Sequence, residues 1–122
     1  MRNAQFLAEQ NAKPIWHPMA HPAEMHERPP KVIVAADGVH ITDTDGHRTF
    51  DAVGGLWNVN LGYSNEAVKE AIKKQVDVLP YYSGSRGTGT DTAIELAHDL
   101  VEFFEPEGMA RTFFTSGGSD SV

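Results

Sequence analysis

The chain has 122 residues, of which 17 are acidic and 10 basic, so its net charge at pH 7 is −7. An acidic chain without a basic patch is a poor partner for nucleic acid, and no apolar run approaches the roughly 20 residues of a membrane helix. The chain has no cysteine, which excludes disulfides and thiolate metal sites. Its N-terminus holds Glu9 and lacks the apolar core of a signal peptide, so the composition predicts a cytoplasmic protein.

The first thirty residues predict a short helix followed by a proline-rich arm. Residues 3–11 favour a helix that Pro14 would end. Five prolines between residues 13 and 30 predict an extended or irregular chain after it. This arm nevertheless carries three large apolar side chains that need burial, either on the body of the protein or on a partner subunit: Trp16, Met19 and Met25.

Three histidines in the same arm raise the question of a metal site. They are His17, His21 and His26. The prolines among them prevent the regular helix that would bring His17 and His21 onto one face, so we expect no metal site here.

The next segment has the pattern of a three-stranded antiparallel meander. Short stretches at residues 32–36, 39–43 and 48–51 favour strands. The pairs Asp37-Gly38 and Asp45-Gly46 between them are turn signals, and turn chemistry explains them without a binding role.

Residues 51–64 break this regularity. They combine three glycines with Leu56, Trp57 and Tyr63, a mixture too irregular for a helix and too rich in glycine for a central strand. A large aromatic side chain on such a loop either fills the core or lines a pocket, and the sequence alone leaves the two alternatives equal.

Two amphipathic helices are predicted next, at residues 65–79 and 90–104. Asn65 is a good N-cap for the first. Its apolar side chains recur on one face of a helix: Val68, Ile72, Val76 and Leu79. The second helix carries an equally regular apolar stripe and ends near Pro106. A loop with three glycines and two tyrosines, residues 81–89, joins the two helices.

The end of the chain predicts a phosphate-binding loop. Residues 111–115 are apolar and aromatic and favour a buried strand, a Ser-Gly-Gly-Ser turn follows, and Asp120 with Ser121 would begin a helix. In that order, the free N–H groups of Gly118 and Ser119, the Ser119 hydroxyl and the positive end of the helix dipole would face an anion. The pattern is neither a dinucleotide fingerprint nor a nucleotide P-loop, and alone it also fits an ordinary loop.

The chain stops at Val122, before this helix completes a turn, so we expect it to be the N-terminal part of a longer protein. A meander, two helices and a buried strand predict the start of an α/β protein.

Four stretches together carry a family resemblance. They are Gly54 to Gln75, Asp43-Thr44-Asp45-Gly46 with Phe50-Asp51, Leu79-Pro80-Tyr81-Tyr82, and Phe114 to Val122. In this order and spacing, through about nine-tenths of the chain, they resemble the start of the class III (omega) aminotransferases, which are pyridoxal-phosphate enzymes of fold type I. The last stretch is similar to the family's cofactor-phosphate loop, T-N-S-G-S-E-A, with Gly117 in place of the usual Ser and Asp120 in place of the usual Glu.

The resemblance implies an α/β fold that forms the N-terminal portion of a PLP fold type I aminotransferase. An N-terminal arm would occupy residues 1–30. A small-domain antiparallel meander with the substrate loop would occupy residues 31–64. Residues 65–122 would supply helices and the first strand of the large PLP-binding domain.

The resemblance also implies site residues. Gly118 and Ser119 match the positions that hold the phosphate of pyridoxal 5'-phosphate, and Trp57 matches an aromatic residue that lines the substrate pocket. Three further candidates lie at or near pocket positions: Met19, Ser85 and Tyr82. Relatives often carry bulky or aromatic groups at the first two positions, so the preferred amine stays open. In such dimers the loop around Ser85 commonly reaches the neighbouring subunit's site.

The implied reaction moves an amino group from an amine or omega-amino acid to pyruvate or a similar keto acid, in a homodimer or a tetramer. We expect no catalytic residue within residues 1–122, because the family's cofactor-binding lysine comes later in the chain, and this stretch alone should be inactive. Two alternatives stay open. One is another fold type I reaction, that of an aminomutase, racemase or decarboxylase. The other is a non-catalytic homologue that serves only dimerisation.

Overall fold

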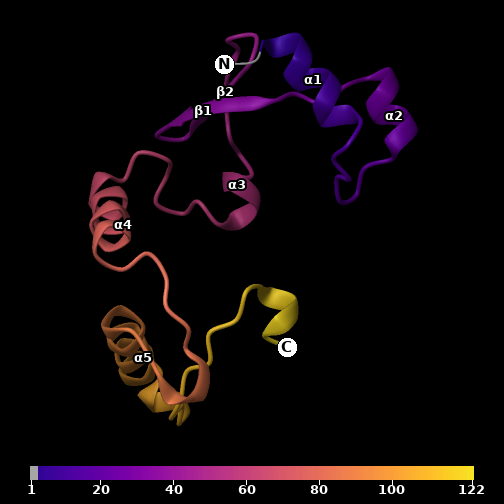
Figure 1. Cartoon of the computed structure of the whole chain (residues 1–122). Coiled ribbons are helices and arrows are strands. Elements are labelled where there is room, and N and C mark those ends of the chain that lie inside the picture. Colours follow the sequence, from indigo (N-terminus) through magenta and orange to yellow (C-terminus); the bar gives the residue numbers. More distant parts are fainter. Residues whose placement is uncertain (1–2) are drawn as a thin grey trace. The chain divides into compact units, whose positions relative to one another are not determined.

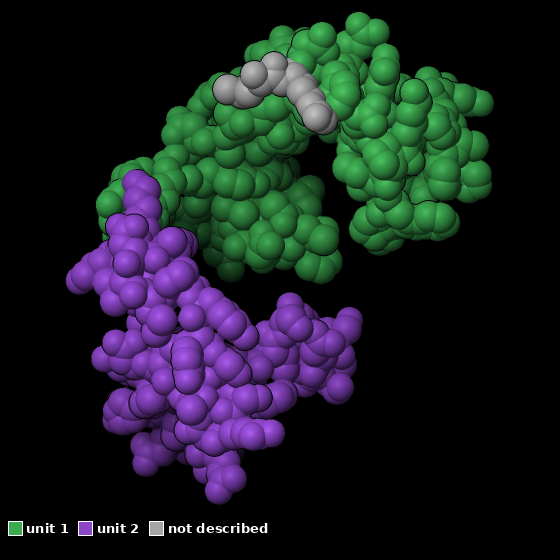
Figure 2. All heavy atoms as spheres, viewed as in Figure 1, with its two compact units in different colours: residues 1–71 green, residues 72–122 purple. Residues whose placement is uncertain are grey.

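The computed structural model describes residues 3–122, and Figure 1 shows the order of their helices and strands. The chain divides into two compact units between Ala71 and Ile72 (Figure 2). The division falls within one helix, α4 (Glu66–Val78), and the predicted three-part organisation stays a prediction. None of the helices in residues 3–122 is long and apolar enough to span a membrane.

The arm begins with the predicted helix, α1 (Ala4–Ala12). The Asn3 side chain caps it by accepting a hydrogen bond of 2.8 Å from the Phe6 N–H. The helix ends at Ala12, before Pro14, as predicted, because a proline has no N–H group to continue the helical hydrogen bonds.

The prediction of an irregular arm between residues 13 and 30 is wrong at one place, where α2 (Pro22–Glu27) forms. Pro22 occupies the start of this helix, where its missing N–H costs no intrahelical hydrogen bond. The His21 ring caps the same end, since its Nδ1 accepts a bond of 3.3 Å from the Ala23 N–H. The proline therefore starts a helix instead of preventing one.

The predicted meander is present, with strands that pair antiparallel in chain order: β1 (Ile33–Asp37), β2 (His40–Asp43) and β3 (Arg48–Phe50). Asp37 pairs with His40, so the first turn is centred on Gly38 and Val39 and not on the predicted Asp37 and Gly38. Gly38 has a φ of +57°, a conformation that glycine adopts without steric cost.

Asp43, the last residue of β2, organises the second turn, and its side chain is only 4% exposed. The carboxylate accepts hydrogen bonds from the N–H groups of Asp45 (3.0 Å) and His47 (2.9 Å) and lies 3.3 Å from the Lys31 Nζ. Burial raises the pKa of this carboxyl. The hydrogen bonds from His47, Lys31 and Asp45 together outweigh burial and hold the pKa at about 2.

Asp43→Asn is expected to destabilise the protein more at neutral pH than at pH 2. The folded-state pKa of about 2 lies below the value of about 3.9 in an unfolded chain. The ionised carboxylate therefore stabilises the fold above about pH 4, and this contribution is lost as the pH falls toward 2. Unfolding temperatures of both proteins, measured from pH 7 to pH 2, check this. A difference between them that stays constant over the whole range would contradict it.

Both predicted amphipathic helices are present, as α4 and α5 (Asp91–Phe103). The Asn65 side chain caps α4 by accepting a bond of 3.1 Å from the Val68 N–H. The Thr90 hydroxyl caps α5 in the same way, through a bond of 3.3 Å from the Ala93 N–H. Side-chain caps of this kind define where a helix begins, which explains why both starts could be read from the sequence.

Residues 111–115 form no strand, which contradicts the prediction of a buried one, and Phe113 is 89% exposed. A buried strand needs neighbouring strands for its N–H and C=O groups, and residues 72–122 contain no other strand. The Thr112 hydroxyl instead ties the segment to α5 by donating to the Ala97 carbonyl at 3.4 Å. The helix expected after it is a single 3₁₀ turn, Gly118–Asp120.

Only two apolar side chains are buried in the part of the chain that the structure describes, those of Ala12 and Met25. Met25 thus meets the expectation of burial, whereas Trp16 and Met19 are exposed. The amphipathic faces predicted for α4 and α5 are likewise largely uncovered within residues 3–122.

Candidate functional site

The glycine-rich segment 51–63 forms a closed loop whose two ends are joined by Asp51 and Tyr63. The Tyr63 hydroxyl donates a hydrogen bond of 2.6 Å to Oδ2 of Asp51. The Asp51 N–H in turn donates to the Val39 carbonyl at 2.9 Å, which fixes the base of the loop to the β-hairpin. Compact loops with adjacent ends are common carriers of functional residues.

The Asp51 carboxylate also binds the chain just beyond it. Oδ1 accepts bonds from the N–H groups of Val53 (3.2 Å) and Gly54 (3.1 Å), and Oδ2 accepts one of 2.8 Å from Gly55. The Tyr63 hydroxyl, followed by the Gly55 N–H, lowers the pKa of Asp51 despite the opposing effect of burial. The same Tyr63–Asp51 bond raises the pKa of the tyrosine. Asp51 is therefore a charged acceptor shared by four donors.

These contacts hold a short helical turn, α3 (Gly54–Trp57), in the left-handed region. The φ values are +57° at Gly54, +61° at Gly55, +66° at Leu56 and +69° at Trp57. For an L-residue with a Cβ this region costs about 1–2 kcal/mol. The sequence prediction that this segment is not a regular helix is confirmed, because all four residues of the turn, two glycines followed by Leu56 and Trp57, have positive φ values.

The turn presents its two large side chains to the surroundings, since Leu56 is 73% and Trp57 82% exposed in this chain. Of the two alternatives left open for Trp57, a core plug and a pocket wall, the core plug is excluded within residues 3–122. Strained turns that persist in folded proteins cluster at ligand sites, which makes this turn a candidate wall of a pocket.

The far end of the loop is bound to the first hairpin turn. The Tyr63 N–H donates to the Gly38 carbonyl at 2.8 Å, and the Gly38 N–H donates to the Ser64 Oγ at 2.6 Å. The Ser64 hydroxyl donates to the Asp37 carboxylate, and this bond is the main cause that lowers the pKa of Asp37. The far end of the loop is thus fixed by contacts between segments 25 to 27 residues apart in sequence, and its base by the Asp51–Val39 bond between residues 12 apart.

An open pocket of about 490 Å³ lies along this loop and the start of α4. It is lined by residues 58–63 together with Asn65, Val68 and Lys69. The Lys69 ammonium forms an ion pair of 2.8 Å with Glu66, so this lysine does not offer a free amine to the pocket.

The predicted phosphate loop lies in the second unit. The hydrogen bonds within this loop do not involve the predicted phosphate donors. The Asp120 N–H donates to the Gly117 carbonyl at 3.1 Å, and the Ser121 hydroxyl donates to the same carbonyl at 3.0 Å. No hydrogen bond in residues 3–122 uses the N–H groups of Gly118 and Ser119 or the Ser119 hydroxyl. A Cβ built on Gly118 would meet nothing within 4 Å, so the space beside it is open. Three donors are therefore available to a phosphate group.

The acidic residue of this loop, Asp120, forms a hydrogen bond within the loop. Asp120 accepts a bond of 2.9 Å from the Ser116 hydroxyl through its Oδ2. Because the turn is only three residues long, the helix dipole expected from the sequence contributes little, and the individual N–H and O–H donors remain. This donor set fits the phosphate end of pyridoxal phosphate.

The remaining predicted pocket residues lie elsewhere on the chain. Met19 has a φ of +60°, is fully exposed and lines a pocket of about 490 Å³ with residues of α2. Ser85 begins a 3₁₀ turn, Ser85–Gly87, where its N–H donates to the Ser83 hydroxyl at 3.1 Å. Tyr82 precedes this turn and is 56% exposed.

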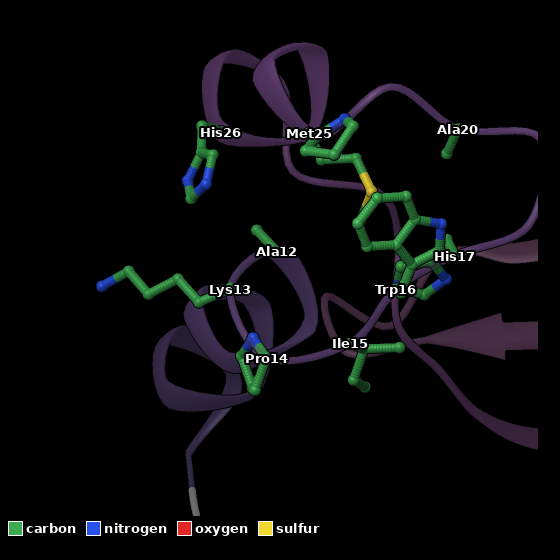
Figure 3. Close-up of a pocket in the computed structure, with 10 residues that line it drawn as sticks. Ala12, Lys13, Pro14, Ile15, Trp16, His17, Ala20, Met25 and His26 are labelled. Atoms are coloured by element: carbon green, nitrogen blue, oxygen red, sulfur yellow. The ribbon is translucent and has the colours of Figure 1, made fainter.

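A further pocket on the arm, of about 200 Å³, is lined by residues of α1, α2 and the link between them (Figure 3). Trp16 and Met25 lie together on one side of it, and the Lys13 side chain extends away from it. None of the residues predicted for the site lines this pocket.

The six predicted site residues are divided between the two units. Met19 and Trp57 belong to the first unit, and the others belong to the second: Tyr82, Ser85, Gly118 and Ser119. The sequence reasoning missed Asp51 and Tyr63 as anchors of the Trp57 loop. Both occur in recognised motifs, but their spacing of 12 residues across three glycines has no period that predicts contact.

Comparison with known proteins identifies the family of this chain. A family model described as aminotransferase class III matches residues 22–122. The chain is 37% identical over 98 residues to putrescine–pyruvate aminotransferase of Pseudomonas aeruginosa, covering 80% of this chain and 21% of that protein. It is 35% identical over 120 residues to adenosylmethionine-8-amino-7-oxononanoate aminotransferase of Geobacter sulfurreducens, covering 98% of this chain and 26% of that protein.

Solved structures agree with these relatives. An (S)-enantioselective omega-transaminase from Thermomicrobium roseum superposes with a TM-score of 0.93 at 32% identity, over 99% of this chain and 27% of that chain. An amine transaminase from an uncultivated Pseudomonas species, in its PLP-bound form, superposes with a TM-score of 0.83 at 47% identity, over 88% of this chain and 24% of that chain.

The chain therefore spans about a quarter of the length of the relatives it matches. The predicted fold class is confirmed, since the structural neighbours are PLP fold type I transaminases and the chain is a part of that α/β fold. The family model covers most of the chain, and this chain belongs to the class III aminotransferases.

Proposed function

We propose that the whole protein is a pyridoxal-phosphate-dependent aminotransferase that moves an amino group from an amine or omega-amino acid to pyruvate or a similar keto acid. The observation that carries the proposal is the set of three unused donors at Gly118 and Ser119 in a chain of the class III family. The named relative from Pseudomonas aeruginosa, a putrescine–pyruvate aminotransferase, supports an amine as donor and pyruvate as acceptor.

The residues of this chain would bind and orient. The N–H groups of Gly118 and Ser119 and the Ser119 hydroxyl would hold the cofactor phosphate, as small loops with convergent donors hold anions. When bound, pyridoxal phosphate supplies the electron sink that allows a proton to leave the carbon beside the amino group. None of the residues 3–122 is proposed to move that proton.

Trp57 and three further pocket residues would set the choice of donor. Trp57 stands on a strained turn with its indole exposed, which suits a wall that limits the size of the donor. A tryptophan-to-glycine variant of the omega-transaminase from Pseudomonas jessenii was engineered for the synthesis of enantiopure bulky amines, and that enzyme superposes on 94% of this chain with a TM-score of 0.89. We assign Trp57 the corresponding role. Met19, Ser85 and Tyr82 are proposed as further pocket residues.

A homodimer or tetramer and a cytoplasmic location stay predictions. The first would allow the segment around Ser85 to reach the neighbouring subunit's site. Size-exclusion chromatography with light scattering on the whole protein would measure the oligomeric state.

The proposed function is tested by the absorbance of the whole protein with pyridoxal phosphate. We expect a visible band from bound cofactor that bleaches when a simple amine is added and returns with pyruvate. A band that ignores every donor would instead support a racemase, aminomutase or decarboxylase. If no band forms, the chain belongs to a non-catalytic homologue, and the loop of Gly118 and Ser119 is only a loop.

A further inference from the structure

The turn Gly54–Trp57 adopts a conformation that its own sequence does not favour. Leu56 and Trp57 have φ values of +66° and +69°, and both side chains are mostly exposed. Packing among residues 3–122 therefore does not hold them there. A strained and exposed turn persists only where neighbouring contacts over-determine it.

Those contacts converge on Asp51. Its carboxylate accepts the N–H groups of the residues that enter the turn, Val53, Gly54 and Gly55, at 2.8–3.2 Å. Its fourth donor, the Tyr63 hydroxyl at 2.6 Å, comes from the other end of the loop. The Asp51 side chain thus joins the entry of the turn to the far end of the loop.

The turn is also tight inside. A Cβ on Gly55 would lie 2.5 Å from Val59 Cγ2 and 2.7 Å from Asn58 Oδ1, so any other residue would have to displace these two side chains and adopt a strained φ of +61°. The backbone bonds Trp57 N–H to Val53 O (2.9 Å) and Asn58 N–H to Gly54 O (3.1 Å) close it. The indole position therefore depends on where Asp51 holds the first residues of the turn.

We infer that Asp51 is a positioning residue that selects the amino donor through Trp57, by locking the left-handed turn that carries the indole. The inference rests on the proposed function and deepens it, because it names what decides donor size at that site. Asp51 touches neither donor nor cofactor in this role. It acts through the backbone of residues 53–55 and through Tyr63.

The test uses the whole protein and two variants, Asp51→Asn and Tyr63→Phe. The selectivity is the ratio of kcat/KM for a bulky arylalkyl amine to kcat/KM for a short omega-amino acid, with pyruvate as acceptor. Asp51→Asn should raise this ratio at least about fivefold. The neutral amide is a weaker acceptor, so the turn becomes more mobile and the indole can move aside for a bulky donor. Tyr63→Phe should raise it less, because the three N–H contacts remain. The change should appear mainly as a lower KM for the bulky donor.

A double-mutant cycle tells positioning from general damage. In a Trp57→Ala background, Asp51→Asn should leave the ratio unchanged within about twofold, because the group it positions is gone. Asp43→Asn is the matched control. Asp43 is also a carboxylate of the first unit that holds backbone N–H groups, but it organises the other turn and should not change selectivity. An additive effect of Asp51→Asn in the Trp57→Ala background would overturn the inference.

A second readout does not need catalysis. In a Trp16→Phe background, Trp57 is the one remaining tryptophan of residues 1–122. The fluorescence of tryptophans elsewhere in the whole protein is measured in the double variant Trp16→Phe/Trp57→Phe and subtracted. Asp51→Asn should speed the decay of Trp57 fluorescence anisotropy. An unchanged decay together with unchanged selectivity would overturn the inference even if the wild-type protein transaminates. If the wild-type protein binds no cofactor, the proposed function fails, and the anisotropy alone decides whether Asp51 holds the turn. If Asp51→Asn fails to fold, Tyr63→Phe carries both measurements.

Discussion

Ser119→Asp should lower the affinity of the whole protein for pyridoxal phosphate by at least about 100-fold. The substitution removes a hydroxyl donor that no group in residues 3–122 uses. It also places a carboxylate about 5 Å from a phosphate, which costs about 3 kcal/mol per pair of charges at an effective dielectric constant of about 20. Titration of the cofactor-free protein with pyridoxal phosphate, followed by its absorbance, measures the change.

Two neighbouring variants calibrate this result. Ser119→Ala removes only the donor and should weaken binding about 10-fold, the usual effect of losing one hydrogen bond to a charged group. Ser121→Ala is the matched control, because the Ser121 hydroxyl is already engaged with the Gly117 carbonyl at 3.0 Å and should change affinity little. Equal affinities of Ser119→Asp and the wild-type protein for pyridoxal phosphate would show that this loop does not bind the cofactor phosphate.

Gly62→Ala should destabilise the protein by about 2–4 kcal/mol. Gly62 has a φ of +73°, and a Cβ there would lie 2.8 Å from the Gly38 carbonyl oxygen. That oxygen belongs to the backbone and accepts the Tyr63 N–H at 2.8 Å, so it cannot move without breaking the bond that fixes the loop. The left-handed conformation costs about 1–2 kcal/mol for alanine, and displacing the hairpin turn adds a comparable amount. Denaturant unfolding of the whole protein measures the loss.

Gly46→Ala separates these two causes. Gly46 has a φ of +84°, but a Cβ there would meet nothing within 4 Å. It should therefore cost only the conformational part, about 1–2 kcal/mol. If the two variants were equally destabilised, the close approach of Gly62 to Gly38 would have no energetic importance.

The elements that could be predicted are those that local chemistry controls. The side chains of Asn65 and Thr90 cap α4 and α5, and the apolar residues between cap and end recur at helical spacing. Gly38 marks the first hairpin turn in the same local way, although the pairing of Asp37 with His40 moves the turn by one residue. Each of these signals acts within about four residues of the structure it determines.

The errors arise where a local rule meets a different context. Proline disrupts a helix interior, but Pro22 stands at the first helical position and therefore starts α2. The apolar and aromatic run at residues 111–115 favours a buried strand, yet a strand exists only with partners to pair its backbone, and none lies beside it in residues 72–122. Position in the helix and the presence of neighbours are not encoded in these short segments.

The amino-acid sequence was sufficient for the family, for the antiparallel meander, and for the helices α1, α4 and α5, because motifs and periodic patterns are properties of consecutive residues. The left-handed turn of Trp57 was not accessible in this way. It depends on one carboxylate, Asp51, that joins residues 53–55 to Tyr63, and on the Gly38 carbonyl that receives the Tyr63 N–H from 25 positions along the chain. Such contacts depend on how the chain folds back on itself in three dimensions. Glycine allows many backbone conformations, so residue spacing in a glycine-rich loop does not predict which residues meet.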